Sequence, residues 1–314
     1  MFEIRRYSKK DQEVWNKFVE CSRQGTFLFD RNYMDYHKDR FHDYSLMFYY
    51  NGNLFALLPA NSSENTLWSH QGLTYGGLLT CDKVTAEEII NLFKEMNMYL
   101  KGKGFMHVIY KPVPWIYKKY PSEEDLYALT YTCKASISVR NLSATIDMSH
   151  PIKWRHDRHY NANKAARNGI RVSQENNAFP EFWEVLEGNL ALTYHTKPVH
   201  SLSEIQGLAT QFPNNIKLYV ARLHGNVVGG VVMYIMPNIV HTQYISATWE
   251  GKRLHAIDAL MRNIIKEWEG KRKFFDFGIS NEDHGRILNL SLMSQKEGFG
   301  GRGLCYDWYK WTLS

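Results

Sequence analysis

The chain has 314 residues, 44% of them hydrophobic and 14% aromatic, which excludes a disordered protein and predicts an ordered globular fold of two domains. The longest apolar stretch, residues 227–236, is too short to cross a bilayer, and the charged beginning MFEIRRYSKK lacks the apolar core of a secretory signal. The net charge of +6 at pH 7 is concentrated in one segment, which favours a phosphate-bearing partner.

The four cysteines are scattered along the chain and form no CxxC pair or zinc-ligand spacing. We expect them to be free thiols in the reducing environment of the cytoplasm, and we expect a cytoplasmic protein without a membrane span. The chain has 13 histidines but no HExxH or similar ligand pair, so we expect neither a metal site nor a tightly bound cofactor.

In the first half of the chain, two helices precede a hairpin, a further strand, a helix and a closing strand. The hairpin is indicated by two apolar runs that flank the turn at Gly52, and the later helix by an apolar face that ends at Gly102. The expected ranges are 11–23 and 31–41 for the opening helices, 45–50 and 54–59 for the hairpin, 66–70 for the further strand, 85–101 for the helix and 105–110 for the closing strand.

The second half repeats this order. Its expected ranges are 217–223 and 227–234 for the hairpin, 239–247 for the further strand, 252–269 for the helix and 274–279 for the closing strand. Gly225 corresponds to Gly52 in the hairpin turn, and Gly270 corresponds to Gly102 at the end of the helix. The matched spacing indicates an internal duplication, in which residues 45–110 and 217–279 share one fold. The alternative is chance recurrence of a common element order.

The segments outside the two copies complete the prediction. Pro151 marks the expected boundary between an N-terminal domain, 1–150, and a C-terminal domain, 151–314. The remaining expected elements are a helix at 122–132, strands at 135–148 and 170–174, helices at 152–168, 179–195 and 202–209, and an aromatic strand at 306–313. The last strand could pair with either domain.

The segment 151–173 holds most of the excess positive charge, with six lysine and arginine residues against the single acid Asp157. We predict that Arg158, Lys164 and Arg167 bind the phosphates of a ligand, on or near a cleft between the domains. The alternative is that these side chains form a solvated helix face.

Residues 273–303 read as a strand, a turn, a helix that Asp283 would cap, and a glycine-rich loop. Lys296 lies in the last turn of this helix, directly before the loop that contains Gly300, Gly301 and Arg302. In one interpretation, Lys296 offsets the negative end of the helix dipole and the glycines form a surface turn. In the other, Lys296 and the loop bind an anion or a developing oxyanion.

The triplet Asp276-Phe277-Gly278 matches one short motif of protein kinases. A kinase also requires a catalytic HRD loop upstream and a glycine-rich loop near the beginning of the domain, and this sequence has neither. We therefore exclude a kinase.

The repeated hairpin, strand, helix and strand resemble the tandem GNAT architecture, and the chain resembles more specifically the FemABX-like peptidoglycan aminoacyltransferases and their bacterial relatives. Two segments carry this resemblance. WRHDRHYNANKAARNGIRV, at 154–172, is similar to the arginine-rich helix and G-[IV]-x-V strand of that family. FDFGISNEDHGRILNLSLMSQKEGFGGR, at 275–302, is similar to its terminal strand, helix and K-x-x-F-G loop.

The resemblance implies an α/β fold of two tandem GNAT-like domains, each a mixed, mostly antiparallel sheet flanked by helices. It also implies transfer of an acyl or aminoacyl group to an amine, a substrate cleft, and a role for the lysine of the terminal loop, here Lys296. The implied acceptor is an amine of a cell-envelope precursor, either an amino sugar or a peptide.

One feature departs from the ordinary GNAT pattern. Such enzymes bind the coenzyme A pyrophosphate on an [RQ]-x-x-G-x-[GA] loop at a helix N-terminus. The corresponding residues here are 250–257, where Gly251 is retained and His255 and Ile257 occupy positions expected to be glycine. This disfavours the usual binding of coenzyme A, whereas an aminoacyl-tRNA needs no such loop. Acyl-CoA and aminoacyl-tRNA both remain alternatives as the donor co-substrate.

Amide formation requires a base for the amine, and the polar segment 194–200 offers two candidates. His195 or His200 could accept the proton, while Tyr194 and Lys197 are candidates for substrate binding. A lone histidine in a loop is also commonly a simple surface residue.

The strand at 239–247 is expected to line the acceptor cleft, which makes Tyr244 a catalytic candidate and Gln243 a substrate-binding one. Asp276 could orient Lys296. Alternatively, Tyr244 belongs only to the core or to the wall of the cleft, and Asp276 is an ordinary acid in a strand next to a loop.

We therefore expect a GNAT-like, FemAB-like N-acyltransferase. Two alternatives remain. The first is a degenerate copy that binds the same ligand without catalysis, which the missing glycines favour and the intact Lys296 loop opposes. The second is a module that binds tRNA or another RNA through the basic helix, although no RRM, KH or zinc-finger signature is present.

Overall fold

The computed structural model describes residues 1–313, apart from the side chains of Thr193, Tyr194 and His284. The chain divides into two compact units. Unit 1 consists of Met1–Asn141, Asp283–Ile287 and Cys305–Ser314, and unit 2 of Leu142–Glu282 and Leu288–Leu304. The last strand of the chain therefore ends in unit 1. Three of the described strands, β9 (Ser136–Asp147), β16 (Ile287–Leu288) and β17 (Arg302–Thr312), contribute residues to both units.

Unit 2 contains a mixed sheet with the strand order β10-β11-β12-β13-β14-β9. Its further strands are β10 (Arg171–Gln174), β11 (Ile216–Leu223), β12 (Asn226–Ile235), β13 (Ile239–Ala247) and β14 (Phe274–Ile279). Its helices are α5 (His156–Arg167), α6 (Phe179–Tyr194), α7 (Leu202–Gln211), α8 (Trp249–Arg253), α9 (Ala256–Trp268) and α10 (Leu290–Gly298). Neighbouring strands run antiparallel, except that β13 and β14 are parallel.

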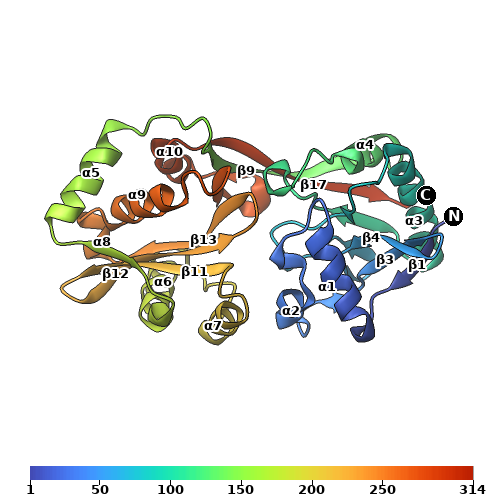
Figure 1. Cartoon of the computed structure of the whole chain (residues 1–314), viewed down its shortest axis with the longest axis horizontal. Helices are drawn as coiled ribbons and strands as arrows, with labels where there is room; N and C mark the ends of the chain where they lie inside the picture. Colours follow the sequence, from blue (N-terminus) through green and yellow to red (C-terminus); the bar gives the residue numbers. More distant parts are fainter. Residues whose placement is uncertain (314) are drawn as a thin grey trace. The chain divides into compact units, whose positions relative to one another are not determined.

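Helices cover both faces of this sheet. In Figure 1, α9 and α5 lie over one face of β11–β13, and α6 and α7 lie over the opposite face. The main core of unit 2 lies between α9 and the sheet, where Leu260 and Ile264 of the helix pack with Val231 and Phe275 of the strands. The one-sided apolar pattern that predicts this helix therefore corresponds to its buried face.

The β11–β12 hairpin confirms the turn prediction. His224 and Gly225 connect the two strands, and both residues have positive φ angles, 49° and 87°. Such a pair is typical of the tight turn that matches the twist of a hairpin, and glycine adopts the second position without strain.

The helix expected at 252–269 is interrupted. It forms as α8 and α9, separated by Leu254 and by His255, which has a φ angle of +62°. Gly251 is required for packing, because a Cβ atom at this position would lie 2.0 Å from the carbonyl oxygen of Val228 in β12. The glycine retained from the nucleotide-binding pattern thus allows α8 to approach the sheet closely.

The parallel pair β13–β14 is short, and this creates an opening in the sheet. The strands pair at three positions, from Ile239 with Phe274 to His241 with Asp276. Beyond this last pair, β13 continues to Ala247 while β14 pairs with β9 on its other side. A bulge between β12 and β13 at Val232 and Met233 accompanies the separation.

Unit 1 contains a four-stranded antiparallel sheet, β1-β3-β4-β7, and a second sheet whose part in this unit has the order β17-β8-β6-β5-β2. The strands are β1 (Glu3–Arg6), β2 (His42–Asp43), β3 (Leu46–Tyr50), β4 (Asn53–Leu58), β5 (Asn61–Ser63), β6 (Thr66–Trp68), β7 (Leu79–Thr80) and β8 (His107–Tyr110). The helices are α1 (Gln12–Cys21), α2 (Arg31–Met34), α3 (Ala86–Gly102) and α4 (Glu124–Tyr131).

The element order of unit 1 matches that of unit 2 around the main helix. The β3–β4 hairpin turns at Asn51 and Gly52, and α3 lies in the chain between β6 and β8, which pair in parallel. In unit 2, α9 likewise lies between the parallel strands β13 and β14. Superposition of residues 45–110 on 217–279 remains a prediction of this shared order.

The helix expected at 31–41 is shorter in the structure. α2 ends at Met34 and is followed by a single 3-10 turn, Asp35–His37. The buried side chain of Arg31 pairs with Asp35 and Asp43, and it thereby ties this turn to the neighbouring segment. Two short strands, β15 (Asn281–Glu282) and β16 (Ile287–Leu288), complete the elements.

Two further observations concern the chain as a whole. Within residues 1–313, no helix is both long and apolar enough to cross a membrane. The four cysteines are free thiols, as the sequence predicts.

Candidate functional site

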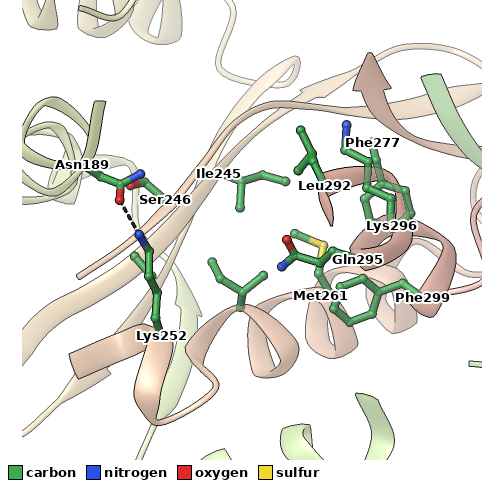
Figure 2. A pocket seen from close by; sticks show the side chains of 12 residues that line it. Asn189, Ile245, Ser246, Lys252, Met261, Phe277, Leu292, Gln295, Lys296 and Phe299 are labelled. Atoms are coloured by element: carbon green, nitrogen blue, oxygen red, sulfur yellow. Dashed lines mark hydrogen bonds between the residues drawn. The ribbon is translucent and has the colours of Figure 1, made fainter. Parts of the chain in front are cut away.

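Unit 2 contains a cavity of about 290 Å³ at the ends of β13 and β14, where the two strands separate (Figure 2). The carboxyl ends of parallel strands are a common place for ligand sites in α/β folds. The cavity is lined by residues of β13 and β14 (Ile245, Ser246, Ala247 and Phe277), of α6, α8 and α9 (Asn189, Lys252, Ile257 and Met261), and of α10 with the residue after it (Leu292, Gln295, Lys296 and Phe299).

Lys296 lines this cavity and has a buried ammonium group. Its side chain is directed towards the end of β14, where Nζ donates to the carbonyl oxygens of Gly278 and Ile279, each at 2.8 Å, and to the hydroxyl oxygen of Ser280 at 2.9 Å. The residue is only 5% exposed. Burial lowers the pKa of Lys296 from 10.5 to about 8, although the charge of Asp276 opposes this effect.

The helix that presents Lys296 differs from the predicted one. α10 begins after Asn289, whose side chain accepts from the backbone N–H of Leu292, so Asn289 and not Asp283 is the N-cap. Ile287 precedes the helix, and Leu290 is exposed within it. The helix is therefore shorter than the sequence predicts.

The glycine loop after α10 does not offer its backbone donors to a ligand. The N–H groups of Gly300 and Gly301 donate to the carbonyl oxygens of Glu297 and Lys296, which ends the helix. A Cβ atom on Gly300 would lie 2.6 Å from the carbonyl oxygen of Ile152. In this structure both N–H groups are therefore engaged within the chain and Gly300 serves close packing, while anion binding by Gly300 and Gly301 stays a prediction. Arg302 is exposed and donates to the Gly301 carbonyl oxygen.

Asp276 organises a buried polar cluster in the sheet. Its carboxylate accepts from the hydroxyls of Ser143, at 2.6 Å, and Thr145, at 2.8 Å, and lies 2.7 Å from Nδ1 of His241. Burial alone would raise the pKa of Asp276, but the hydrogen bond and charge of His241, with the two hydroxyls, lower it to about 2.

The structure therefore changes the role expected of Asp276. Its carboxylate is hydrogen-bonded to His241, Ser143 and Thr145, and its negative charge favours the charged form of Lys296. His241 was not predicted from the sequence. The available signal was a histidine near the beginning of the strand 239–247, at the position that pairs with Asp276.

His200 and Tyr244 form a second pair. Nδ1 of His200 lies 2.6 Å from the hydroxyl oxygen of Tyr244, which also accepts from the backbone N–H of His200 at 3.3 Å. Burial raises the pKa of Tyr244 to about 12, while hydrogen bonds from the His200 backbone and from Gln243 oppose this shift. The structure thus brings together His200, Tyr244 and Gln243 from the predicted site.

The other candidates of this segment lie apart from the cavity lining. His195 ends α6 with a φ angle of +51°, and both His195 and Lys197 are exposed. The side chain of Tyr194 lies outside the described residues.

The basic helix α5 contains two kinds of cation. Lys164 and Arg167 are exposed, as a surface that binds phosphates requires. Arg158 is largely buried, pairs with the buried carboxylate of Asp258 at 3.1 Å and lies over the ring of Phe299 at 5.0 Å. Arg158 therefore connects α5 to α9, and reversal of its charge would place a second negative charge next to the buried carboxylate of Asp258.

Lys252 is a further residue of the cavity that was not predicted to be functional. It lies in α8, and its ammonium group donates to the side chain of Asn189 in α6. Figure 2 shows this pair at one end of the cavity, with Lys296 and Phe277 at the other and Ile245 and Met261 between them. In the part of the chain that the structure describes, no cluster of three or more His, Cys, Asp or Glu side chains could hold a metal ion.

Comparison with known proteins identifies relatives of both the C-terminal part and the whole chain. Residues 153–286 match the family model described as an acetyltransferase (GNAT) domain. Comparison with curated proteins finds no match.

Several solved structures share the fold of nearly the entire chain. A structure of FemX superposes with a TM-score of 0.69 at 10% identity, over 99% of this chain and 97% of FemX. The C-terminal domain of a putative lysylphosphatidylglycerol synthetase from Agrobacterium fabrum gives 0.62 at 12% identity, over 97% and 92%. L-PGS from Bacillus licheniformis gives 0.61 at 14% identity, over 98% and 93%. These similarities confirm the predicted fold class of two GNAT-like domains.

Proposed function

We propose that this chain, whose residues 153–286 match the GNAT acetyltransferase domain and which has the fold of FemX, transfers an acyl or aminoacyl group to an amine of a cell-envelope precursor. The observation that carries the proposal is the cavity at the ends of β13 and β14, which is lined by Lys296, a lysine whose ammonium group is buried. The envelope acceptor is supported by the fold shared with FemX, with the C-terminal domain of a putative lysylphosphatidylglycerol synthetase and with L-PGS.

In the proposed reaction, the nitrogen of the acceptor amine attacks the carbonyl carbon of the donor. A C–N bond forms and the carbonyl oxygen becomes an oxyanion, which returns to a carbonyl as the thiol or ribose oxygen of the donor leaves. The amine loses one proton, and the leaving group takes one up. The site must therefore supply positive charge near the oxyanion and an acceptor for the proton.

Lys296 is suited to supply the positive charge. Its ammonium group is removed from bulk water, so its attraction for an oxyanion is stronger than that of a surface lysine. Two of its donors are directed to backbone carbonyls of β14, while the third is directed to the hydroxyl of Ser280. We propose that an oxyanion of the substrate replaces the hydroxyl, because an oxyanion is a stronger partner for a cation than a neutral hydroxyl oxygen is.

The pair formed by His200 and Tyr244 is the proposed route for the proton. Tyr244 lies on β13, the strand whose next three residues line the cavity, and its raised pKa keeps the phenol protonated at neutral pH. The imidazole of His200 contacts this phenol at 2.6 Å and can hold the proton that the amine releases.

The test is a transfer assay with the purified chain. Acyl-CoAs and aminoacyl-tRNAs are each incubated with amino sugars and with amino-terminal peptides of envelope precursors, and products are detected by mass spectrometry. We expect a new amide that requires both the chain and one donor class. Binding of donor and acceptor without any amide would instead favour a ligand-binding protein that lacks catalysis.

A further inference from the structure

The end of α10, the helix that carries Lys296, is held by the segment that begins α5. The backbone N–H of Arg155 donates to the carbonyl oxygen of Gly298 at 2.9 Å, and Nη1 of Arg155 donates to the hydroxyl oxygen of Ser294 at 3.1 Å. Ser294 and Gly298 lie about one turn apart in α10. The residue that caps α5 therefore contacts the last turn of α10 at two points, once through its backbone and once through its side chain.

Arg158 contacts the same helix end through its guanidinium group. Its Nη1 atom pairs with the carboxylate of Asp258 in α9 at 3.1 Å, and both side chains are largely buried. The guanidinium carbon also lies over the ring of Phe299, 5.0 Å from the ring centroid. Because the group is planar and its ion pair fixes it, it restrains this ring more tightly than a flexible ammonium group could. Phe299 directly follows α10, so Arg158 links α9 to the end of α10.

Gly298 is the position that lets the two arginines approach α10. A Cβ atom at this position would lie 3.0 Å from Nε of Arg158, and equally close to Nε and Nη2 of Arg155. This is closer than ordinary van der Waals contact, and the ion pair with Asp258 limits how far the Arg158 guanidinium can move. A glycine in the last turn of this helix is therefore explained by the contact with the guanidinium groups.

These contacts reach Lys296 by two routes. Along the chain, the N–H groups of Phe299 and Gly301 donate to the carbonyl oxygen of Lys296 at 3.1 and 3.2 Å. Through space, the ring of Phe299 stacks on the ring of Phe277. Gly278 follows Phe277, and its carbonyl oxygen accepts from the Lys296 ammonium group at 2.8 Å. The two rings and Lys296 lie at the same end of the cavity (Figure 2), so a movement of Phe299 would shift both the lysine and its acceptor.

We propose that Arg158 is a positioning residue, which fixes the end of α10 and thereby the Lys296 ammonium group that stabilises the oxyanion. Asp258 and Gly298 hold the guanidinium group in place, and Phe299 transmits its effect. This inference rests on the proposed function and deepens it, because Arg158 then acts within the protein and not by binding the phosphates of a ligand. Displacement of a catalytic group by about 1 Å can lower a rate by about 10²-fold, so a small shift of α10 is sufficient.

The first experiment reports on Lys296 without any substrate. In protein that contains isotopically labelled lysine, the NMR signal of the Lys296 side chain is identified by its absence from Lys296→Met, and its titration gives the pKa. Burial lowers this pKa to about 8, although the charge of Asp276 opposes the effect. Arg158→Lys keeps a cation beside Asp258 but removes the planar group over Phe299. We expect the ammonium group to become more accessible to water and its pKa to rise towards 10.5.

Two further variants make the result specific. Gly298→Ala places a methyl group against the Arg158 guanidinium and should stay folded, because alanine favours a helix, so it should move the Lys296 pKa in the same direction. Arg262→Lys is the matched control, because Nη1 of Arg262 in α9 donates to the side chain of Asn163 in α5 at 2.7 Å and so links the same two helices. The control should leave the Lys296 pKa and kcat unchanged. Circular dichroism shows whether each variant is folded, and Gly298→Ala decides the question if Arg158→Lys is not.

The second experiment measures kcat and KM in the transfer assay. In Arg158→Lys, kcat should fall by up to about 10²-fold, with a smaller change in KM, because the ammonium group acts on the oxyanion. An unchanged kcat in a chain that is active would overturn the inference. An equal fall of kcat in Arg262→Lys would overturn it as well, because the loss would then follow from any loosening of α5 against α9.

The NMR result separates this inference from the proposed function. An unchanged Lys296 pKa in a folded Arg158→Lys protein would overturn the inference and leave the proposed function intact. A raised pKa in Arg158→Lys, combined with a wild-type chain that transfers no acyl or aminoacyl group, would support the positioning of Lys296 and contradict the proposed function.

Discussion

Replacing Lys296 by methionine removes the ammonium group while keeping an unbranched side chain, and two opposing effects on stability follow. The fall of the Lys296 pKa from 10.5 to about 8 corresponds to about 3 kcal/mol against the charged form in the folded state, a cost that methionine avoids. Methionine also leaves the Gly278 and Ile279 carbonyls and the Ser280 hydroxyl without this donor, at a cost of about 1–3 kcal/mol for a buried unsatisfied group. We therefore expect the free energy of unfolding to change by less than about 2 kcal/mol.

The effect on the reaction should be much larger. If the ammonium group stabilises the oxyanion, its loss lowers kcat by about 10²–10³, with a smaller effect on donor affinity. Steady-state kinetics with the donor and acceptor of the transfer assay give kcat and KM, and urea unfolding gives the stability. Ser280→Ala keeps the ammonium group and releases one of its donors, so its kcat should stay near the wild-type value. Lys266→Met removes an exposed lysine and should change neither quantity.

The dependence on pH provides an independent readout. Between about pH 8 and 10.5, the folded state binds fewer protons at Lys296 than the unfolded state does, so this residue makes stability rise with pH. In the same range the ammonium form is lost and kcat should fall. Lys296→Met should abolish both changes. Wild-type kcat in a folded Lys296→Met protein would refute the catalytic role, and a loss of more than about 4 kcal/mol of stability would show that the residue is mainly structural.

Three further predictions concern other parts of unit 2. Asp276→Asn removes the charge that raises the Lys296 pKa, so the alkaline fall of kcat should move to lower pH, and an unchanged pH profile of kcat would contradict the coupling between the two residues. The variant should also lack the part of the stability that Asp276 gives the wild type above pH 3.8 and that is lost as the pH falls to about 2. Replacing both exposed residues Lys164 and Arg167 by glutamate should change the free energy of unfolding by less than about 0.5 kcal/mol. The affinity for tRNA or another phosphate-bearing ligand should fall and depend less on salt, whereas an unchanged affinity would show that α5 is a solvated face. Gly300→Ala should lower the free energy of unfolding, measured in urea, by about 1–3 kcal/mol, because φ is +91° and the new Cβ meets a backbone oxygen. The control Gly188→Ala, in open space within α6, should raise it by about 0.5–1 kcal/mol, and equal stabilities of the two variants would refute the packing argument.

The sequence by itself determined the elements whose signals are local. Turn chemistry at Gly52 and Gly225 predicted both hairpins, because a glycine next to asparagine or histidine permits the positive φ angles that a tight turn needs. Thr85 and Glu88 form the capping box that begins α3, and the one-sided apolar pattern of α9 corresponds to its buried face. These signals depend on residues within a few positions of each other, so they can be read without knowledge of the fold.

The tertiary structure decided what the candidate residues contact. From the sequence, Lys296 could simply lie in solvent and offset the dipole of its helix. The fold instead directs its ammonium group to the end of β14, to residues that lie 16 to 18 positions earlier in the chain. His241 and Asp276 are separated by 35 residues and meet because β13 and β14 pair there. The cavity exists because these strands separate after that pair. Strand pairing and strand separation are long-range events, to which no local propensity corresponds.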